Sequence, residues 1–219
     1  MGDLEEIRKR IISCHKCPRL MEYIKYVANN PPKRFRGWKY WAKPVPSFGD
    51  ENAEIVIVGL APAANGGNRT GRLFTGDHSG EWLFKALYEV GLANQPFSIS
   101  VDDGLKVYNV YITAVLHCAP PLNKPNRDEL RNCRPYLVEE LRNLRNAKVI
   151  VTLGRVAFKT VTEIYGVRLE FRHLAKYKIN DGLWIVASYH PSARNTNTGL
   201  LKWDEWVEVF REAKRLARV

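Results

Sequence analysis

The amino-acid sequence predicts an α/β fold in which parallel strands alternate with helices. Residues 54–59 form a continuous apolar, β-branched run, which is typical of a strand buried on both faces of a sheet. Three further apolar runs follow, and amphipathic helical patterns separate them. No repeat and no Ser/Gly-rich linker divides the 219 residues. We therefore expect one three-layer α/β/α domain over residues 1–219, with a central four-stranded parallel sheet.

The expected elements follow in chain order. Residues 3–28 predict a helix that is interrupted by a turn at 14–18. Residues 29–52 are too rich in proline and aromatic residues for a regular element and predict an ordered basic loop, suited equally to nucleic-acid binding and to attachment to the core. Strands are expected at 54–59, 107–115, 149–153 and 183–189. Helices are expected at about 82–90, at 127–144 with Asn126 as N-cap, from 154 to about 165, and at 200–216.

The charge balance bears on the class of partner. Lys and Arg number 34 against 23 Asp and Glu, so the formal net charge is +11. This excess favours a polyanionic partner such as nucleic acid, although a generally basic surface would give the same count. The longest apolar run, residues 55–61, is far shorter than the ~20 residues that span a bilayer. The first residues are acidic and lack the apolar region of a secretory signal, so no membrane contact and a cytoplasmic location are expected.

Four cysteines indicate a metal centre. Cys14 and Cys17 form a C-x2-C pair, and Cys118 and Cys133 are separated by 14 residues. The short pair suits metal chelation, whereas disulfides are uncommon in a cytosolic chain of this size. The spacing of the second pair fits an iron–sulfur cluster at least as well as zinc. From spacing alone a [4Fe–4S] cluster, a zinc ion and free buried cysteines remain open alternatives.

The loop after the first strand can approach a flat ligand. Residues 59–77 contain several glycines and small residues that permit tight turns and leave backbone N–H groups accessible. Arg69 and Arg72 in this loop are candidates for contact with phosphates. Neither the Gly-Lys-Ser/Thr of a phosphate-binding loop nor the dinucleotide spacing G-x-G-x-x-G is present. A plain surface loop is the alternative interpretation.

Polar side chains follow the ends of the other strands. Asn123 follows the second strand, His190 ends the fourth, and Asp77 ends the loop after the first. Ligands of parallel α/β sheets bind beyond the carboxyl ends of the strands. An amide, an imidazole and a carboxylate are therefore expected to converge there, which favours an enzyme over a passive binding protein.

These motifs together resemble a known family. They are GLAPAANGGNRTGR at residues 59–72, FTGD at 74–77, HPS at 190–192 and the four cysteines. The chain resembles the uracil-DNA glycosylase superfamily over nearly its whole length, and within it the iron–sulfur, type B (family 5) enzymes of archaea and bacteria. The resemblance implies a uracil-DNA glycosylase-like α/β/α fold and a structural [4Fe–4S] cluster on Cys14, Cys17, Cys118 and Cys133. It also implies monofunctional excision of uracil from DNA by base flipping, which leaves an abasic site.

The resemblance implies roles for individual residues. Phe74 stacks on the flipped base, and His190 donates a hydrogen bond to uracil O2. Asp77 orients or deprotonates the water or stabilises the cationic sugar, with capping of the helix near Ser79 as the alternative, and Asn123 contacts the base or the water. The base-binding residues are expected to be Gly59, Ala61, Ala63, Phe74 and Ala114. The residues expected to bind DNA are Arg69, Thr70, Arg72, Ser192, Arg194 and Asn195, with Arg194 as the candidate wedge.

Two departures from the superfamily pattern bear on chemistry and specificity. Residues 60–64 (Leu-Ala-Pro-Ala-Ala) carry no acidic residue or asparagine where many relatives have one, so the role of Asp77 is inferred rather than matched. Ala114 stands where relatives place an asparagine that reads uracil. Without that amide the pocket loses one means of rejecting other bases, so excision of deaminated purines such as hypoxanthine is also expected.

Two other classes of function are alternatives. A non-catalytic, metal-stapled nucleic-acid-binding module explains the charge and the cysteines but gives no role to Asp77, Asn123 and His190. A nucleotide-hydrolysing enzyme is disfavoured by the missing lysine of a phosphate-binding loop. A monomer is expected for an enzyme that wraps a duplex, and a sliding clamp is a candidate protein partner.

Overall fold

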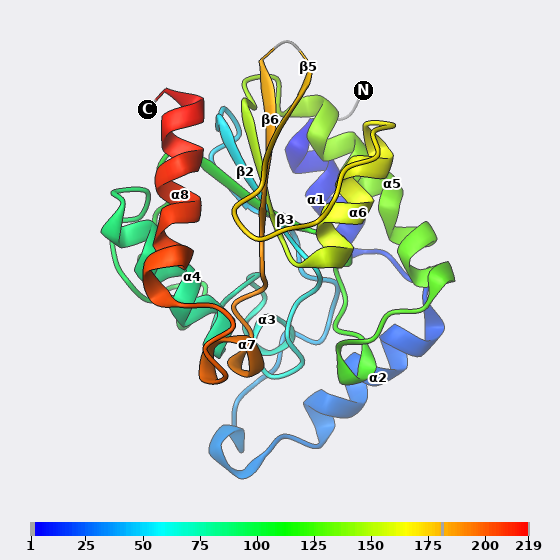
Figure 1. The fold of residues 1–219 in the computed structure, drawn as a ribbon. Helices are drawn as coiled ribbons and strands as arrows, with labels where there is room; N and C mark the ends of the chain where they lie inside the picture. Colours follow the sequence, from blue (N-terminus) through cyan, green and yellow to red (C-terminus); the bar gives the residue numbers. More distant parts are fainter. Residues whose placement is uncertain (1–2, 181, 219) are drawn as a thin grey trace.

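The computed structural model describes residues 3–180 and 182–218, and it has three layers (Figure 1). In this part of the chain a single sheet holds six strands in the order β1-β3-β2-β4-β6-β5. Four of them are parallel and confirm the predicted core of the sheet. They are β2 (Ile55–Gly59), β3 (Val110–Ala114), β4 (Val149–Leu153) and β6 (Leu183–Ser188).

Two antiparallel edge strands extend the sheet beyond the four that the sequence predicts. The two-residue β1 (Phe48–Gly49) pairs with β3 inside the segment expected to be an irregular loop. On the opposite edge β5 (Lys176–Asn180) pairs with β6. Its residues alternate between exposed and half-buried, as expected for a strand with one face in solvent.

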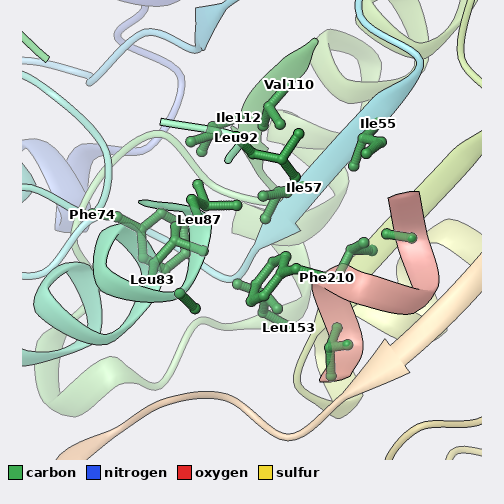
Figure 2. Packing of buried hydrophobic residues seen from close by; sticks show 14 of the residues in the cluster. Ile55, Ile57, Phe74, Leu83, Leu87, Leu92, Val110, Ile112, Leu153 and Phe210 are labelled. Carbon is green, nitrogen blue, oxygen red and sulfur yellow. The ribbon is translucent and has the colours of Figure 1, made fainter. Parts of the chain in front are cut away.

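Helices cover both faces of the sheet. α4 (His78–Glu89) and α8 (Trp203–Ala217) pack on one face, where Ile55 and Ile57 point (Figure 2). α1 (Leu4–Ile12), α5 (Arg127–Asn143) and α6 (Arg155–Ile164) pack on the other, where Val56 and Val58 point. The side chains of a strand alternate between faces, so a strand with two buried faces must be apolar throughout.

Local sequence signals set the helix boundaries. The predicted interruption of the N-terminal helix is confirmed, because α1 ends before Cys14 and α2 (Pro18–Asn29) begins at a proline, which suits the first position of a helix. Asn126 is the N-cap of α5, as predicted, and forms a reciprocal capping box with Glu129. The last helix begins at Trp203 rather than near residue 200.

Short helical segments gather at the carboxyl ends of the parallel strands (Figure 1). They are α3 (Gly67–Thr70), the 3-10 helix η2 (Pro121–Asn123) and α7 (Ala193–Asn197). A second 3-10 helix, η1 (Lys33–Phe35), lies in the basic loop after α2. None of the helices in the described part of the chain has the length and apolar character needed to cross a membrane.

The basic loop after α2 is attached to the core around α3. The backbone N–H of Trp41 donates to the carbonyl of Arg69 over 3.0 Å, and that of Ala42 donates to Asn68 over 3.1 Å. The hydroxyl of Tyr40 donates to the side-chain oxygen of Asn65 over 2.7 Å. Of the two roles left open for its aromatic residues, attachment to the core is therefore observed for Tyr40 and Trp41.

Candidate active site

A cavity of about 410 Å³ opens at the carboxyl edge of the parallel strands. Its volume lies within the range of about 300–1,000 Å³ that is usual for small-ligand sites. Loops after β2 and β6, the start of α4 and the segment after β3 all contribute to its wall. The lining residues are Leu60, Ala61, Ala63, Phe74, Asp77, His78, Ser79, Asn123, His190, Ser192 and Ala193.

Phe74 forms an aromatic wall of the cavity. Its backbone has a φ of +52°, a left-handed conformation that is uncommon for a bulky residue and is often found at functional sites. Its ring packs so closely on the backbone of Gly59 that a Cβ there would lie 2.6 Å from Phe74 Cζ. Gly59 does not line the cavity itself but leaves the space that the ring occupies.

His190 lies directly after β6 and faces the aromatic wall. Its ring centroid is 6.2 Å from that of Phe74, with an angle of 28° between the two planes. Burial lowers the pKa of His190 to about 4, so the imidazole is neutral near pH 7. The side-chain amide of Asn195 donates to the His190 carbonyl over 2.9 Å and fixes the backbone of this turn. A neutral imidazole carries one N–H that can donate to a ligand without bringing a full charge into the cavity.

Asp77 is both the N-cap of α4 and a lining residue. Its Oδ1 accepts the backbone N–H of Gly80 over 2.9 Å, so the capping interpretation is confirmed. Its Oδ2 lies against Gly66, where a Cβ would collide with the carboxylate. Burial raises the pKa of Asp77. Capping therefore fixes the carboxylate at the cavity wall and leaves a second oxygen for chemistry.

Asn123 brings an amide to the same wall. It ends η2 and has a φ of +56°, and the preceding Leu122 has a φ of +55° with 82% of its surface exposed. Asn123 and Asp77 also line an adjoining open groove of about 860 Å³. The structure thus brings together Phe74, Asp77, Asn123 and His190 at one cavity, as the sequence predicts.

Of the other residues expected to contact the base, some line the cavity and one does not. Ala61 and Ala63 line the cavity, and their small side chains leave room for a flat ligand. Ala114 does not: it is 1% exposed and packs in the apolar cluster that also contains Phe74. His78 and Ser79 line the cavity although the sequence analysis did not select them. Their positions next to Asp77, at the start of a helix that follows a glycine-rich loop, were the available signal.

Arg69 and Arg72 were expected to contact phosphates, but both residues are buried. Arg72 is 8% exposed, and its guanidinium is held by Asp103 at 2.7 Å and by the hydroxyl of Ser98 at 2.7 Å. Arg69 is 4% exposed and donates to backbone carbonyls. Thr70 is half-buried, and its hydroxyl donates to the carbonyl of Gly66 over 3.1 Å. These guanidinium groups are enclosed by protein and hold the loop together.

The segment after β6 remains accessible. Ser192 lines the cavity, and its hydroxyl accepts the backbone N–H of Asn195 as the N-cap of α7. Arg194 is exposed on this short helix, and Asn195 is half-buried. A bond of 2.8 Å between His78 Nε2 and the hydroxyl of Thr196 fastens α7 to α4. The polar groups of this segment can therefore meet a ligand that enters the cavity.

The four cysteines converge at a different place, between the α1–α2 turn and α5. Cys14, Cys17, Cys118 and Cys133 are free thiols and line one small cavity with apolar neighbours. Burial, with the neighbouring thiols adding to it, raises the pKa of Cys133 to about 12 and also raises that of Cys118. The side-chain amide of Asn132 donates to Cys17 Sγ over 3.7 Å.

The donor set is of the kind that holds an iron–sulfur cluster. Within the described residues no group of three or more His, Cys, Asp or Glu side chains is arranged to hold one metal ion. A four-iron cluster is wider than one ion and takes four thiolates, so its ligands stand farther apart. Four unpaired thiols around one apolar cavity match that requirement in kind and number.

The fold and the cavity define an α/β protein with a ligand site at the carboxyl edge of its sheet. The chain belongs to the uracil DNA glycosylase superfamily, whose family model matches residues 46–214. It is 46% identical over 213 residues to a type-5 uracil-DNA glycosylase of Pyrobaculum aerophilum, with 97% of this chain and 92% of the relative covered. It is also 46% identical to the type-5 enzyme of Thermus thermophilus, with 98% and 99% covered. A type-4 uracil-DNA glycosylase of Archaeoglobus fulgidus is 32% identical, with 88% and 83% covered.

Proposed function

We propose that this chain hydrolyses the N-glycosidic bond of uracil in DNA and leaves an abasic site. The observation that carries the proposal is the cavity in which Phe74, Asp77, Asn123 and His190 meet. Membership of the superfamily and the names of the type-5 relatives support the same reaction. The enzyme needs no covalent intermediate, because water can attack the sugar directly.

Base flipping precedes the reaction in this proposal. Removing a nucleotide from the duplex costs a few kcal/mol, and this cost is least for a mispaired base such as uracil opposite guanine. The net charge of +11 supplies attraction to the DNA backbone that offsets this cost. The flipped ring enters the cavity beside Phe74, whose aromatic face offers stacking area.

His190 assists departure of the base. When the bond to C1′ of the sugar breaks, its electron pair goes to the base, and negative charge develops on the ring and its carbonyl oxygens. A neutral imidazole donates its N–H to uracil O2 and stabilises this charge where it develops. Because the imidazole is neutral near pH 7, it acts on the departing base as a hydrogen-bond donor and not as a cation.

Asp77 acts on the sugar side of the bond. Its carboxylate is fixed by the bond from Gly80, so it can orient the attacking water or accept its proton. A fixed negative charge also stabilises the cationic sugar of the transition state. Asn123 on the same wall can hold the base or the water.

The same pocket is proposed to accept other deaminated bases, including hypoxanthine. Position 114 is an alanine buried in the core, so no amide there selects the hydrogen-bonding edge of uracil. The polar contacts come instead from Asn123, Asp77 and His190, and alanines 61 and 63 leave space at the wall. A site that lacks a hydrogen-bonding match to one base discriminates weakly among bases.

The four cysteines are proposed to hold a structural [4Fe–4S] cluster. When bound, the cluster would cross-link the four thiolates. Cys14 and Cys17 lie in the turn between α1 and α2, Cys118 follows β3, and Cys133 lies on α5. Their positions would tie the N-terminal helices to the segment that leads to Asn123. Hydrolysis itself requires no electron transfer.

The test uses end-labelled duplexes that carry one uracil, one hypoxanthine or no lesion. Incubation with iron-loaded enzyme is followed by alkali, which cleaves DNA at abasic sites. Cleavage of the uracil duplex only after alkali supports a monofunctional glycosylase, and cleavage of the hypoxanthine duplex at higher enzyme concentration supports the broad pocket. No abasic product from protein that binds DNA and iron would favour a non-catalytic binding module. Sedimentation of the free enzyme and its complex with DNA tests the monomer that we propose.

A further inference from the structure

Arg69 is a buried cation that the proposed reaction does not use. Its side chain lies in α3, and only 4% of the residue is exposed. Within the described part of the chain its Nη1 is buried without a hydrogen-bond partner. A buried charge is costly unless it is held by other favourable contacts, so this arginine requires an explanation.

The hydrogen bonds of Arg69 join two backbone segments that adjoin Asp77. Arg69 Nε donates to the carbonyl of Asn65 over 2.8 Å, and Nη2 donates to the carbonyl of Gly76 over 3.0 Å. Gly76 directly precedes Asp77, and Asn65 directly precedes Gly66, against which the Asp77 carboxylate packs. One planar guanidinium therefore binds the two backbone segments that lie on either side of the Asp77 carboxylate.

The glycine at position 76 fits this arrangement. Its φ is +74°, and the guanidinium of Arg69 occupies the space into which a Cβ would project. Any side chain there would displace Arg69 and would also be strained in the left-handed conformation. The turn that leads into Asp77 is thus built around the arginine.

Two aromatic rings contact the guanidinium. Its Cζ lies 4.0 Å from the ring centroid of Phe35 and 4.3 Å from that of Trp38, both in the basic loop after α2. Aromatic faces attract a cation and replace part of the solvation that burial removes. The planes of the two rings lie 77° apart, so the guanidinium is in contact with aromatic rings in two directions. We call Arg69, Phe35 and Trp38 the Arg69 clamp.

We propose that Arg69 is a positioning residue for Asp77, and that the Arg69 clamp fixes the carboxylate in the place from which it acts on water or the sugar. The inference rests on the proposed function, because it assigns a purpose to Asp77 in that reaction. It also gives the basic loop a role in catalysis through packing. A lysine cannot replace the arginine, since a single ammonium lacks the planar fork that reaches two carbonyls at once.

A double-mutant cycle tests the proposal with four proteins: wild type, Arg69→Lys, Asp77→Asn and the double variant. Asparagine at 77 keeps the helix cap and removes the charge. Each protein is measured for single-turnover excision of uracil at saturating enzyme, for its Kd with a lesion-free duplex and for Tm. Arg211→Gln, which removes an exposed arginine on α8, is the control for loss of a positive charge.

Arg69→Lys is expected to lower the excision rate about 10- to 100-fold, because small misplacement of a catalytic group has effects of this size. Its Kd for the lesion-free duplex should stay within about twofold of the wild-type value. In the Asp77→Asn background the same lysine substitution should change the residual rate less than about twofold, since the positioned group is gone. Arg211→Gln should leave the rate unchanged.

Several outcomes would overturn the inference. An equal fold-loss from Arg69→Lys in both backgrounds would show that Arg69 acts independently of Asp77. Weaker duplex binding with an unchanged rate would assign Arg69 to the DNA backbone instead. A wild-type rate in Asp77→Asn would remove Asp77, and with it Arg69, from the reaction, whereas absence of excision by the wild type would refute the proposed function itself.

A second variant keeps the test decisive if Arg69→Lys does not fold. Trp38→Leu removes one aromatic face from a residue that is 46% exposed, so its cost to the core is small. It should lower the excision rate in the wild-type background and leave the residual rate of Asp77→Asn unchanged. An unaltered rate in Trp38→Leu together with an unaltered Tm would contradict the clamp.

Discussion

Gly59→Ala would place a methyl group against the outer edge of the Phe74 ring, which forms the aromatic wall of the cavity. The new Cβ would lie 2.6 Å from Cζ and 2.8 Å from Cε2 of Phe74, whereas ordinary van der Waals contact begins at 3.4 Å. The ring must therefore retreat by about 0.8 Å, the difference between 3.4 and 2.6 Å. Because Phe74 lines the cavity, moving its ring changes the shape of the space proposed for the base.

The expected result is a large loss of activity with a modest loss of stability. A displacement approaching 1 Å at a reacting site can cost about 100-fold in rate. Overpacking of a buried site costs about 1–3 kcal/mol, which corresponds to a fall in Tm of several degrees. Single-turnover excision of uracil and thermal denaturation of the same preparation measure the two effects.

A substitution at another glycine is the control that distinguishes a change in the pocket from a general loss of stability. Gly166 has a φ of +68° and nothing within 4 Å of an added Cβ, so Gly166→Ala costs about 1–2 kcal/mol through backbone strain alone. It should lower Tm and leave the excision rate unchanged. A wild-type rate in Gly59→Ala, or equal losses of rate in both variants, would refute the role given to the Phe74 ring.

Three further predictions concern other groups. The His190 imidazole should titrate near pH 4 by NMR rather than near its usual ~6.5, and a midpoint near 6.5 would contradict its burial. Its contribution to the stability of the fold is therefore complete above about pH 6.5 and is lost as the pH falls toward 4. Arg72→Gln breaks a buried pair with Asp103 and should lower the free energy of unfolding by about 3–5 kcal/mol in urea, with duplex affinity within about twofold. Weaker DNA binding at unchanged stability would restore Arg72 as a phosphate contact. Cys118→Ser should lower both the iron content and Tm, and full iron content would exclude Cys118 as a ligand.

The buried strands were predictable because burial on both faces leaves a plain pattern. The run at 55–58 is apolar throughout, and each residue meets helices on one side of the sheet or the other. The edge strand β5 was missed because its signal is the short polar–apolar alternation of residues 176–179 and not a continuous apolar run. A two-residue strand such as β1 carries no periodic signal at all.

The candidate site also has a part that the sequence predicts and a part that it does not. Asp77, Asn123 and His190 follow strand ends, and topology alone brings such positions to one edge. Arg69 and Arg72 were misassigned because a sequence shows charge but not burial. The partner of Arg72 lies 31 residues away at Asp103, in a loop whose path no local pattern predicts.

The position of Ala114 shows a further limit of reasoning from sequence. The resemblance places it where relatives read the base, yet its side chain is enclosed in the core. Whether a residue at the end of a strand faces a cavity depends on the neighbouring loops. Here the ring of Phe74, in a backbone conformation that no sequence rule predicts for phenylalanine, supplies the wall.

Release of free uracil measures the central claim most directly. A duplex with one radiolabelled uracil is incubated with excess wild-type enzyme or with the Asp77→Asn/His190→Asn double variant, and the free base is separated by chromatography. We predict one free uracil per lesion from the wild type. The double variant should bind the duplex equally well but release uracil at least about 1,000-fold more slowly, since each such group contributes about 10²–10⁴-fold. Equal release by both proteins would remove the cavity from the chemistry, and no release by either would contradict the proposed reaction.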